Sequence, residues 1–384
     1  MEIFANQPLR SNPHIAVFSS TKIGNFVAIT PLLRGLKEKY PHCTLDFFGS
    51  EITKDLEIDR PYIDWRFSLY TQRSDFLESL TQAVRDRRQV AGDYDLAINC
   101  DEYSEINLVT ITALRPQYIV GGALSLDFRL KLDTRHDPVQ KILGDSDWNS
   151  REFLQRHGEI LQSNYIAEIF CRIAYVETNF FKLELPSQPP KFPVPDILIS
   201  VTATRPAKMW SAAYWQQVIR WCEGRSLTVG LVGNSPKIQR ELYHSGNLEE
   251  ELLSQTSLVD LRGKASLVEL AGAFRQAKAC ITLDSGPLHI AAAVGCPTVA
   301  IFGNDEDGDG ASPFHLWAPR QPHVRVALSQ FKCQLCEKNR FKNSECLLEN
   351  HPCMTFLSPE VVIDRLNAIL DDRSVVTEGI RHSP

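Results

Sequence analysis

Short apolar runs alternate with longer segments of helical periodicity over most of this chain. In the first half, strands are predicted at 14–18, 43–48, 96–99 and 118–120, and helices at 26–40, 76–90 and 165–176. Buried parallel strands read as short apolar runs, whereas helices repeat apolar residues three or four positions apart. The alternation therefore predicts an α/β fold with a parallel sheet that is covered on both faces.

The second half begins the same alternation again. It predicts strands at 197–201, 228–232, 279–283 and 297–302, and helices at 212–222, 266–277, 288–294 and 359–371. Three other segments break the pattern: 19–25 is expected to be a polar turn, 127–156 a loop or lid, and 186–195 a linker. The linker prediction rests on five prolines in ten residues.

A chain of 384 residues is long for a single core, so two domains are expected. We predict an N-terminal acceptor-binding domain at 1–185, the linker at 186–195, a C-terminal nucleotide-binding domain at 196–358, and a helix with a disordered tail at 359–384. Each domain would be a Rossmann-like, doubly wound sheet, and the two would face each other across a cleft.

Composition narrows the class of protein. The chain has 43% hydrophobic and 23% charged residues, which is typical of a globular protein. Its net charge of −6 gives no reason to expect nucleic acid as a partner. It has no apolar run of about 18 residues, so no membrane span is expected. Residues 1–13 lack a signal-peptide pattern, and ten cysteines without such a signal favour a reducing, cytoplasmic setting.

The most informative motif follows the predicted strand at 279–283. That strand runs into Asp284, a Ser-Gly-Pro turn follows, and the next helix is expected to open at Leu288 and His289. Backbone N–H groups at a helix start are unpaired and attract anions, and a small Ser-Gly pair lets a phosphate approach the backbone. We predict a site for a nucleotide diphosphate; the alternative is an ordinary corner between a strand and a helix.

This motif, with the Ile-Ala-Ala-Ala-Val-Gly-Cys-Pro-Thr-Val-Ala-Ile-Phe-Gly run after it, resembles the donor-site signature of glycosyltransferase family 9, the heptosyltransferase family. The resemblance extends to the runs at 22–25, 30–36 and 204–210 and to a cysteine-rich segment, and it covers about residues 14–370. It implies the GT-B fold and an inverting glycosyltransferase. ADP-heptose is the expected donor, and lipopolysaccharide core, another glycan or a protein the expected acceptor.

By this resemblance, Lys208 contacts the donor phosphates and offsets the charge that grows on the leaving diphosphate, without a metal ion. A solvated lysine at a helix start is the alternative. Thr204 would assist through its hydroxyl, and Gly233 ends a strand where such folds bind nucleotides, although a plain turn explains Gly233 equally well. The expected donor-binding residues are Thr204, Lys208, Gly233, Asp284, Ser285, Gly286, Pro287, Leu288 and His289.

The general base departs from the family pattern. Many members place an aspartate directly after the glycine of the N-terminal loop, which here contains Lys22, Gly24 and Asn25. Asn25 cannot take a proton from an acceptor hydroxyl, so a carboxylate elsewhere is needed. Asp101 and then Glu102 are the first choices because they follow the strand at 96–99; Glu105 is more remote. The alternative is that these are solvated loop acids.

Four cysteines lie close together near the end of the chain, in the segment 333–353, here called the Cys-rich segment. Cys333, Cys336, Cys346 and Cys353 include one pair at metal-knuckle spacing, and four thiolates suit tetrahedral zinc or iron. In the family's protein-modifying heptosyltransferases four cysteines hold an iron. We expect a structural zinc or iron here and no cofactor for catalysis; reduced cysteines or a disulfide pair are the alternatives.

Two other functions fit the same motifs. A non-catalytic nucleotide-sugar-binding protein would explain Asn25, and a nucleotide-sugar epimerase or hydrolase would share the fold. A transferase would place the protein in lipopolysaccharide biosynthesis or a related glycosylation, and a homo-oligomer is compatible with the sequence.

Overall fold

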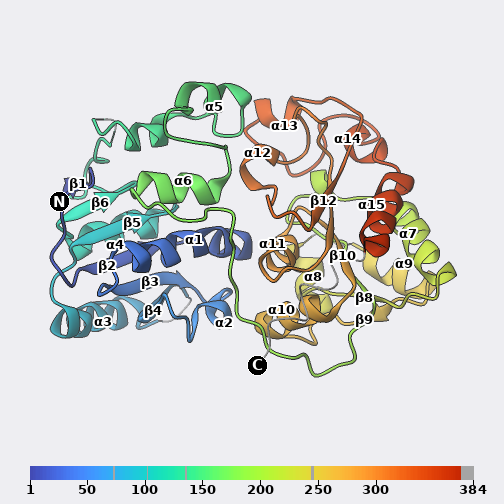
Figure 1. Ribbon diagram of the computed structural model, residues 1–384, viewed down its shortest axis with the longest axis horizontal. Coiled ribbons are helices and arrows are strands. Elements are labelled where there is room, and N and C mark those ends of the chain that lie inside the picture. Colours follow the sequence, from blue (N-terminus) through green and yellow to red (C-terminus); the bar gives the residue numbers. More distant parts are fainter. Residues whose placement is uncertain (72–73, 102, 135, 244–245, 373–384) are drawn as a thin grey trace. The chain divides into compact units, whose positions relative to one another are not determined.

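The computed structural model describes residues 1–71, 74–101, 103–134, 136–243 and 246–372 (Figure 1). The chain forms two compact units, Met1–Glu184 (unit 1) and Leu185–Pro384 (unit 2). Each unit is an α/β structure built on its own sheet. The α/β prediction is therefore confirmed for both halves of the chain.

Unit 1 is built on a six-stranded sheet in the order β1-β6-β5-β2-β3-β4, and all its strand pairs are parallel. Its central strands are short apolar runs with fully buried side chains, as a sheet covered on both faces requires. The strands are β1 Glu2–Ile3, β2 His14–Phe18, β3 Thr44–Ser50, β4 Trp65–Tyr70, β5 Leu96–Asn99 and β6 Tyr118–Val120.

The helices of unit 1 include one close pair, because α1 packs against α6. The segment 127–156, expected to be irregular, contains a 3-10 helix (η1) and α5. The helices are α1 Ile23–Lys39, α2 Lys54–Glu57, α3 Phe76–Ala91, α4 Glu105–Leu114, η1 Gln140–Gly144, α5 Arg151–His157 and α6 Ile166–Ile173.

Unit 2 repeats the plan with a second parallel sheet, in the order β12-β11-β10-β7-β8-β9. Its core includes two buried tryptophans, Trp210 and Trp215, in one cluster with side chains of the central strands. The strands are β7 Ile197–Ser200, β8 Val229–Leu231, β9 Val259–Asp260, β10 Ala279–Leu283, β11 Thr298–Phe302 and β12 Val324–Leu328.

The helices of unit 2 cover this sheet, and the last of them, α15, packs on β10, β11, β12 and α7. The segment 186–195 has no helix or strand and packs on unit 2: the Gln188 N–H donates to the Val268 carbonyl at 2.9 Å. The helices are η2 Pro206–Lys208, α7 Ala212–Gly224, α8 Pro236–Leu242, α9 Leu248–Gln255, α10 Leu267–Gln276, α11 Gly286–Ala293, α12 Phe314–Trp317, α13 Leu335–Lys338, α14 Pro352–Thr355 and α15 Pro359–Asp371.

Each sheet has one point where the chain reverses the direction in which it adds strands. In unit 1 this point lies between β2 and β5, and in unit 2 between β7 and β10. Loops that leave the carboxyl ends of these two strands diverge to opposite sides and leave a crevice, where open α/β sheets bind their ligands. The fold therefore draws attention to the residues after β2, β5, β7 and β10.

Several predicted bounds need correction. The polar turn expected at 19–25 is shorter, because α1 begins at Ile23 and includes Gly24 and Asn25. The helix after β10 begins at Gly286, two residues earlier than expected, since Pro287 fits the first turn of a helix, where its missing N–H costs nothing. Strands β1, β4, β9 and β12 were not predicted. The tail at 373–384 lies outside the described residues.

Among the residues that the structure describes, none of the helices combines the length and the apolar character that crossing a membrane would require.

Candidate functional site

The turn after β7 and the motif after β10 meet at the switch point of unit 2. Lys208 ends the short helix η2, and its ammonium Nζ lies 2.6 Å from Asp284 Oδ2. The two residues are 76 positions apart, but β7 and β10 are neighbours in the sheet, with Ser200 paired to Thr282. Both side chains are largely buried, so the structure brings the predicted lysine and the predicted aspartate into one ion pair.

Asp284 is held in its charged form inside the protein. Burial acts to raise the pKa of its carboxyl, but the nearby Lys208 ammonium outweighs burial, and the pKa ends below its ordinary value. A hydrogen bond from Ser312 also favours the carboxylate. Ser312 was not singled out in the sequence, although its position shortly after β11, beyond Gly303, was an available signal.

His289 lies in the first turn of α11 and is 4% exposed. Burial lowers the pKa of its imidazole to about 4, so the ring is neutral near pH 7. Its Nδ1 is buried and has no hydrogen-bond partner among the described residues, and its ring meets Trp317 edge-to-face. Buried polar atoms are nearly always paired in native proteins, so this nitrogen is a candidate contact for a bound ligand.

The start of α11 has the features that suit an anion. Ser285 precedes the helix, but its hydroxyl does not cap it and instead donates to the Leu283 carbonyl at 3.3 Å. Gly286 and Pro287 form the first turn, followed by the buried Leu288. Because N–H groups at a helix start carry partial positive charge, this end of α11 and the Lys208 ammonium would both attract an anion.

The other two predicted donor residues have different surroundings. Thr204 is exposed in the turn before η2. Gly233 follows β8, and a Cβ atom at this position would lie 2.6 Å from the Gln239 amide nitrogen. Close packing therefore accounts for this glycine, and a nucleotide contact at Gly233 stays a prediction.

In unit 1, Asp101 follows β5 at the corresponding switch point. Burial raises the pKa of its carboxyl, and neither the Tyr103 backbone N–H nor the nearby Lys22 ammonium compensates. The Asp101 backbone N–H donates to Asn99 Oδ1 at 3.0 Å, which orients the loop. A carboxylate with a raised pKa is a better proton acceptor than an ordinary aspartate, and this is a property that a general base needs.

Of the residues predicted for the N-terminal loop, Lys22 interacts with this aspartate. Lys22 precedes α1 and is exposed, and it is close enough to Asp101 to affect its pKa. Gly24 is buried and Asn25 half-buried in the first turn of α1. Glu102 lies outside the described residues. Glu105 is the exposed first residue of α4.

The four cysteines of the Cys-rich segment share one neighbourhood. All are free thiols, so the disulfide alternative is not formed. Burial, and then the three other thiols, raise the pKa of Cys353 to about 12. Among the described residues, no group of three or more His, Cys, Asp or Glu side chains is arranged to hold a metal ion.

Two sulfurs of this segment accept hydrogen bonds from nitrogen. The Asn343 amide donates to Cys336 Sγ at 3.2 Å, and the Leu348 backbone N–H lies 3.5 Å from Cys346 Sγ. Hydrogen bonds of this kind to a cysteine sulfur are typical of cysteines that ligate a metal. Four cysteine sulfurs are the type of donor that zinc and iron bind, and this chemistry is what a metal site here would rest on.

Comparison with known proteins gives matches of two kinds. Residues 175–344 match glycosyltransferase family 9 (heptosyltransferase). Lipopolysaccharide heptosyltransferase 1 of Pseudomonas aeruginosa is 32% identical over 170 residues, which cover 42% of this chain and 44% of that protein. The match thus spans less than half of this curated relative.

Solved structures match over nearly the whole chain. A family 9 glycosyl transferase from Veillonella parvula aligns with a TM-score of 0.70 at 18% identity, covering 95% of this chain and 98% of that one. The dodecameric iron-containing heptosyltransferase TibC, in complex with ADP-D-β-D-heptose, aligns with a TM-score of 0.59 at 16% identity, covering 96% and 78%. These likenesses confirm the predicted GT-B class of fold, with its two Rossmann-like sheets.

Proposed function

This chain carries a glycosyltransferase family 9 domain over residues 175–344, and from this premise we propose that the protein transfers a sugar from a nucleotide-sugar donor to a hydroxyl group of an acceptor. The observation that carries the proposal is the Lys208–Asp284 ion pair at a sheet switch point, beside a buried imidazole nitrogen that has no partner among the described residues.

Unit 2 is the proposed donor-binding unit. The Lys208 ammonium and the N–H groups that open α11 would face the diphosphate and stabilise the charge it gains on leaving. Asp284 would hold Lys208 in place through their 2.6 Å contact, and His289 would donate or accept one hydrogen bond to the donor. Thr204 and Gly233 complete the proposed donor set.

ADP-heptose is the donor we propose. Support comes from the curated relative, named as a lipopolysaccharide heptosyltransferase, and from TibC, whose structure contains ADP-D-β-D-heptose. Lipopolysaccharide core is the proposed acceptor, in line with the word lipopolysaccharide in the relative's name. A protein or another glycan would present the same reacting group, a hydroxyl.

Asp101 is the proposed base. The acceptor oxygen would form a bond to the anomeric carbon as the bond from that carbon to the diphosphate oxygen breaks, with the acceptor proton passing to the Asp101 carboxylate. Attack opposite the leaving group inverts the anomeric configuration. The raised pKa of Asp101 supports this role; Glu102 is the second choice.

The four cysteines are proposed to hold one structural zinc or iron ion. A metal bound by Cys333, Cys336, Cys346 and Cys353 would supply a cross-link within unit 2 and no step of the reaction. The iron-containing TibC structure and the N–H···S bonds in this chain support the proposal.

A binding role without catalysis is the second candidate, and Asn25 favours it. An amide cannot accept the acceptor proton at this position, so the protein would bind a nucleotide-sugar and not turn it over.

A transfer assay with ADP-heptose and heptose-deficient lipopolysaccharide tests the proposal, with the product read by mass spectrometry. Transfer should rise with pH through an apparent pKa above about 3.9, the ordinary value for aspartate, because only the carboxylate accepts a proton. Asp101→Asn should lower the rate by about 10²- to 10⁴-fold. Exposed Glu105→Gln is the control.

Two results would contradict parts of the account. Full rates in both Asp101→Asn and Glu102→Gln would exclude these residues as the base. Tight ADP-heptose binding without turnover by the unaltered protein would favour the binding role.

A further inference from the structure

The Cys-rich segment holds the turn that carries Lys208. The Ala207 backbone N–H donates to the Ser344 carbonyl at 2.9 Å, and the Ala207 carbonyl accepts a hydrogen bond from His351 Nε2 at 2.8 Å. Ala207 is the residue directly before Lys208, so its backbone is tied on both sides to a segment more than a hundred residues further along the chain.

Arg205 adds a second set of bonds at the other end of this turn. Its guanidinium donates to the Asn343 carbonyl at 2.9 Å, to Asn343 Oδ1 at 3.2 Å and to the Ala311 carbonyl at 3.0 Å. Nη2 also lies 3.8 Å from Cys336 Sγ. Arginine has five N–H donors in a fixed planar fork, so one side chain can bridge all these acceptors, which lysine cannot do.

These contacts continue to the cysteines without a break. Asn343 is buried, accepts from Arg205 and donates its own amide to Cys336 Sγ at 3.2 Å. On the other side of the turn, His351 has a φ of +46°, a region that residues other than glycine rarely occupy, and it directly precedes α14, which contains Cys353. The geometry of the thiol cluster and that of the Lys208 turn are therefore linked by direct hydrogen bonds.

The position of Lys208 itself depends on little else. Its ammonium meets the Asp284 carboxylate at 2.6 Å and the Asp284 carbonyl at 3.5 Å, and these are its hydrogen bonds in the described part of the chain. A flexible lysine side chain is directed by the backbone that carries it. A displacement of about 1 Å of a group that stabilises a reacting centre costs about 10²-fold in rate.

We propose that Arg205 and His351 are positioning residues that fix the Lys208 turn on the Cys-rich segment and so hold the Lys208 ammonium at the donor diphosphate. This inference rests on the proposed function, because it requires Lys208 to bind a diphosphate. Arg205 and His351 act through the backbone of Ala207 and Lys208. The Cys-rich segment thereby contributes to donor binding without contacting the donor.

The test compares ADP with adenosine, which has the same base and ribose but no phosphate. Calorimetry measures ADP affinity, and competition measures adenosine affinity. Arg205→Ala and His351→Ala should each weaken ADP binding by about 10- to 100-fold, the equivalent of one lost charge-assisted hydrogen bond, and leave adenosine binding unchanged. A general loss of structure would weaken both ligands alike.

Conservative variants separate geometry from charge. Arg205→Lys keeps the charge but loses the fork, so it should bind ADP nearly as weakly as Arg205→Ala. His351→Gln keeps a side-chain N–H donor and should recover most of the affinity. Combining Arg205→Ala with Lys208→Ala should weaken ADP binding no further than Lys208→Ala alone, because both changes remove the same contact.

Hydrogen–deuterium exchange gives a readout without ligand. Exchange at the Ala207 amide should be faster in Arg205→Ala and His351→Ala, and unchanged in Arg220→Ala, a matched control at an exposed arginine on α7. If exchange increases but ADP affinity does not change, while Lys208→Ala still weakens ADP binding, the positioning role is overturned and the proposed function stands. If Lys208→Ala binds ADP normally, the donor role of Lys208 fails and the positioning role fails with it.

Discussion

Asp46 in unit 1 and Asp284 in unit 2 are both buried aspartates whose pKa lies below the ordinary value in spite of burial. They differ in how many hydrogen-bonding groups around them have a partner within the protein. Asp46 lies near the amino end of β3, and Asp284 follows the carboxyl end of β10. The same residue type therefore occurs on the side of a sheet that stabilises the fold and on the side that binds ligands.

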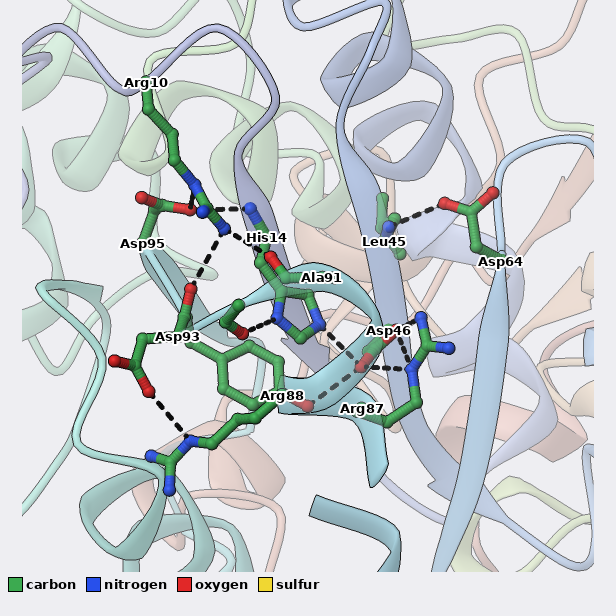
Figure 2. A network of polar contacts seen from close by, with 12 residues as sticks. Arg10, His14, Leu45, Asp46, Asp64, Arg87, Arg88, Ala91, Asp93 and Asp95 are labelled. Atoms are coloured by element: carbon green, nitrogen blue, oxygen red, sulfur yellow. Dashed lines mark hydrogen bonds and ion pairs between the residues drawn. The ribbon is translucent and has the colours of Figure 1, made fainter. Parts of the chain in front are cut away.

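Figure 2 shows the polar network around Asp46, which we call closed because each group named below has a hydrogen-bond partner within the protein. Its carboxylate accepts hydrogen bonds from His14 Nε2 at 2.8 Å, Tyr94 Oη at 2.8 Å, and both Nε and Nη2 of Arg87. His14 Nδ1 in turn meets the Gly92 carbonyl at 2.8 Å. Each of these groups has a partner within the protein, so the network needs nothing from outside.

The cluster around Asp284 is open by comparison. One cation, Lys208, and one hydroxyl, Ser312, meet the carboxylate, while the Nδ1 of the neighbouring His289 has no partner among the described residues. A buried group that lacks a partner costs stability, and a bound ligand is one way to supply the missing partner. Both aspartates are buried and both have a lowered pKa, so neither property distinguishes the two clusters. What distinguishes them is whether every hydrogen-bonding group of the cluster has a partner within the protein.

The largest expected effect comes from opening the closed network. Asp46→Asn should lower the free energy of unfolding by about 3–5 kcal/mol, because it leaves the Arg87 guanidinium, whose side chain is 13% exposed, without its counter-charge. Urea titration measures the loss, and transfer per folded molecule should not change. Asp93→Asn is the control: the Asp93 side chain is 87% exposed, so its ion pair with Arg88 is worth about 1 kcal/mol or less. Equal losses in the two variants would contradict this account of Asp46.

Neutralising the open pair should separate function from stability. Lys208→Met combined with Asp284→Asn removes both charges together and should change the free energy of unfolding by about 1 kcal/mol or less, since no buried charge is left unpaired. Transfer should fall by about 10²- to 10³-fold, the typical cost of losing one group that stabilises a leaving charge. Lys237→Ala, at an exposed lysine on α8, is the control. Normal transfer in the double variant would remove the pair from the site.

A smaller effect should appear in the pH dependence of stability. The His289 imidazole takes up a proton near pH 6.5 in the unfolded chain but only near pH 4 in the folded protein. Between these values the unfolded state binds more protons, so stability falls as pH is lowered from about 6.5 to 4. The free energy of unfolding should therefore be lower at pH 5 than at pH 7, and His289→Gln should reduce this difference by about 1–2 kcal/mol. His42→Gln, at an exposed histidine, is the control and should leave this difference unchanged. If the free energy of unfolding depends on pH equally in His289→Gln and the unaltered protein, the buried, neutral imidazole is contradicted.

Sequence patterns predicted the elements that bury continuous apolar runs. The predicted bounds of β2, β5, β6, β10 and α15 agree with the structure, because turn residues bracket each run. Strand β4 was missed since Arg66 and Ser68 interrupt the apolar run of this strand, which lies at the edge of the sheet. Lys208 and Asp284 were both predicted as donor-binding residues, and each follows a strand that the pattern identified. The structure pairs them.

Contacts that depend on distant packing were not predictable in this way. Asp46 lies inside a predicted strand, and a charge there must find partners. Those partners, Arg87 and Tyr94, are 41 and 48 residues away and meet Asp46 only once α3 has packed. The link from Arg205 to Asn343 spans 138 residues and has no periodic signal. Hydrophobic periodicity identifies elements, whereas hydrogen-bond partners are set by tertiary packing.

The central claim is that the open cluster of unit 2 binds the diphosphate of a nucleotide-sugar. Calorimetric titration of the purified protein with ADP-heptose, GDP-sugars and UDP-sugars tests it most directly. The account predicts selective binding of ADP-heptose that is weakened in Lys208→Ala and Asp284→Ala and retained in folded Asp46→Asn. Preference for another nucleotide would contradict the proposed donor, and absence of binding by the folded protein to every nucleotide-sugar would contradict the site itself.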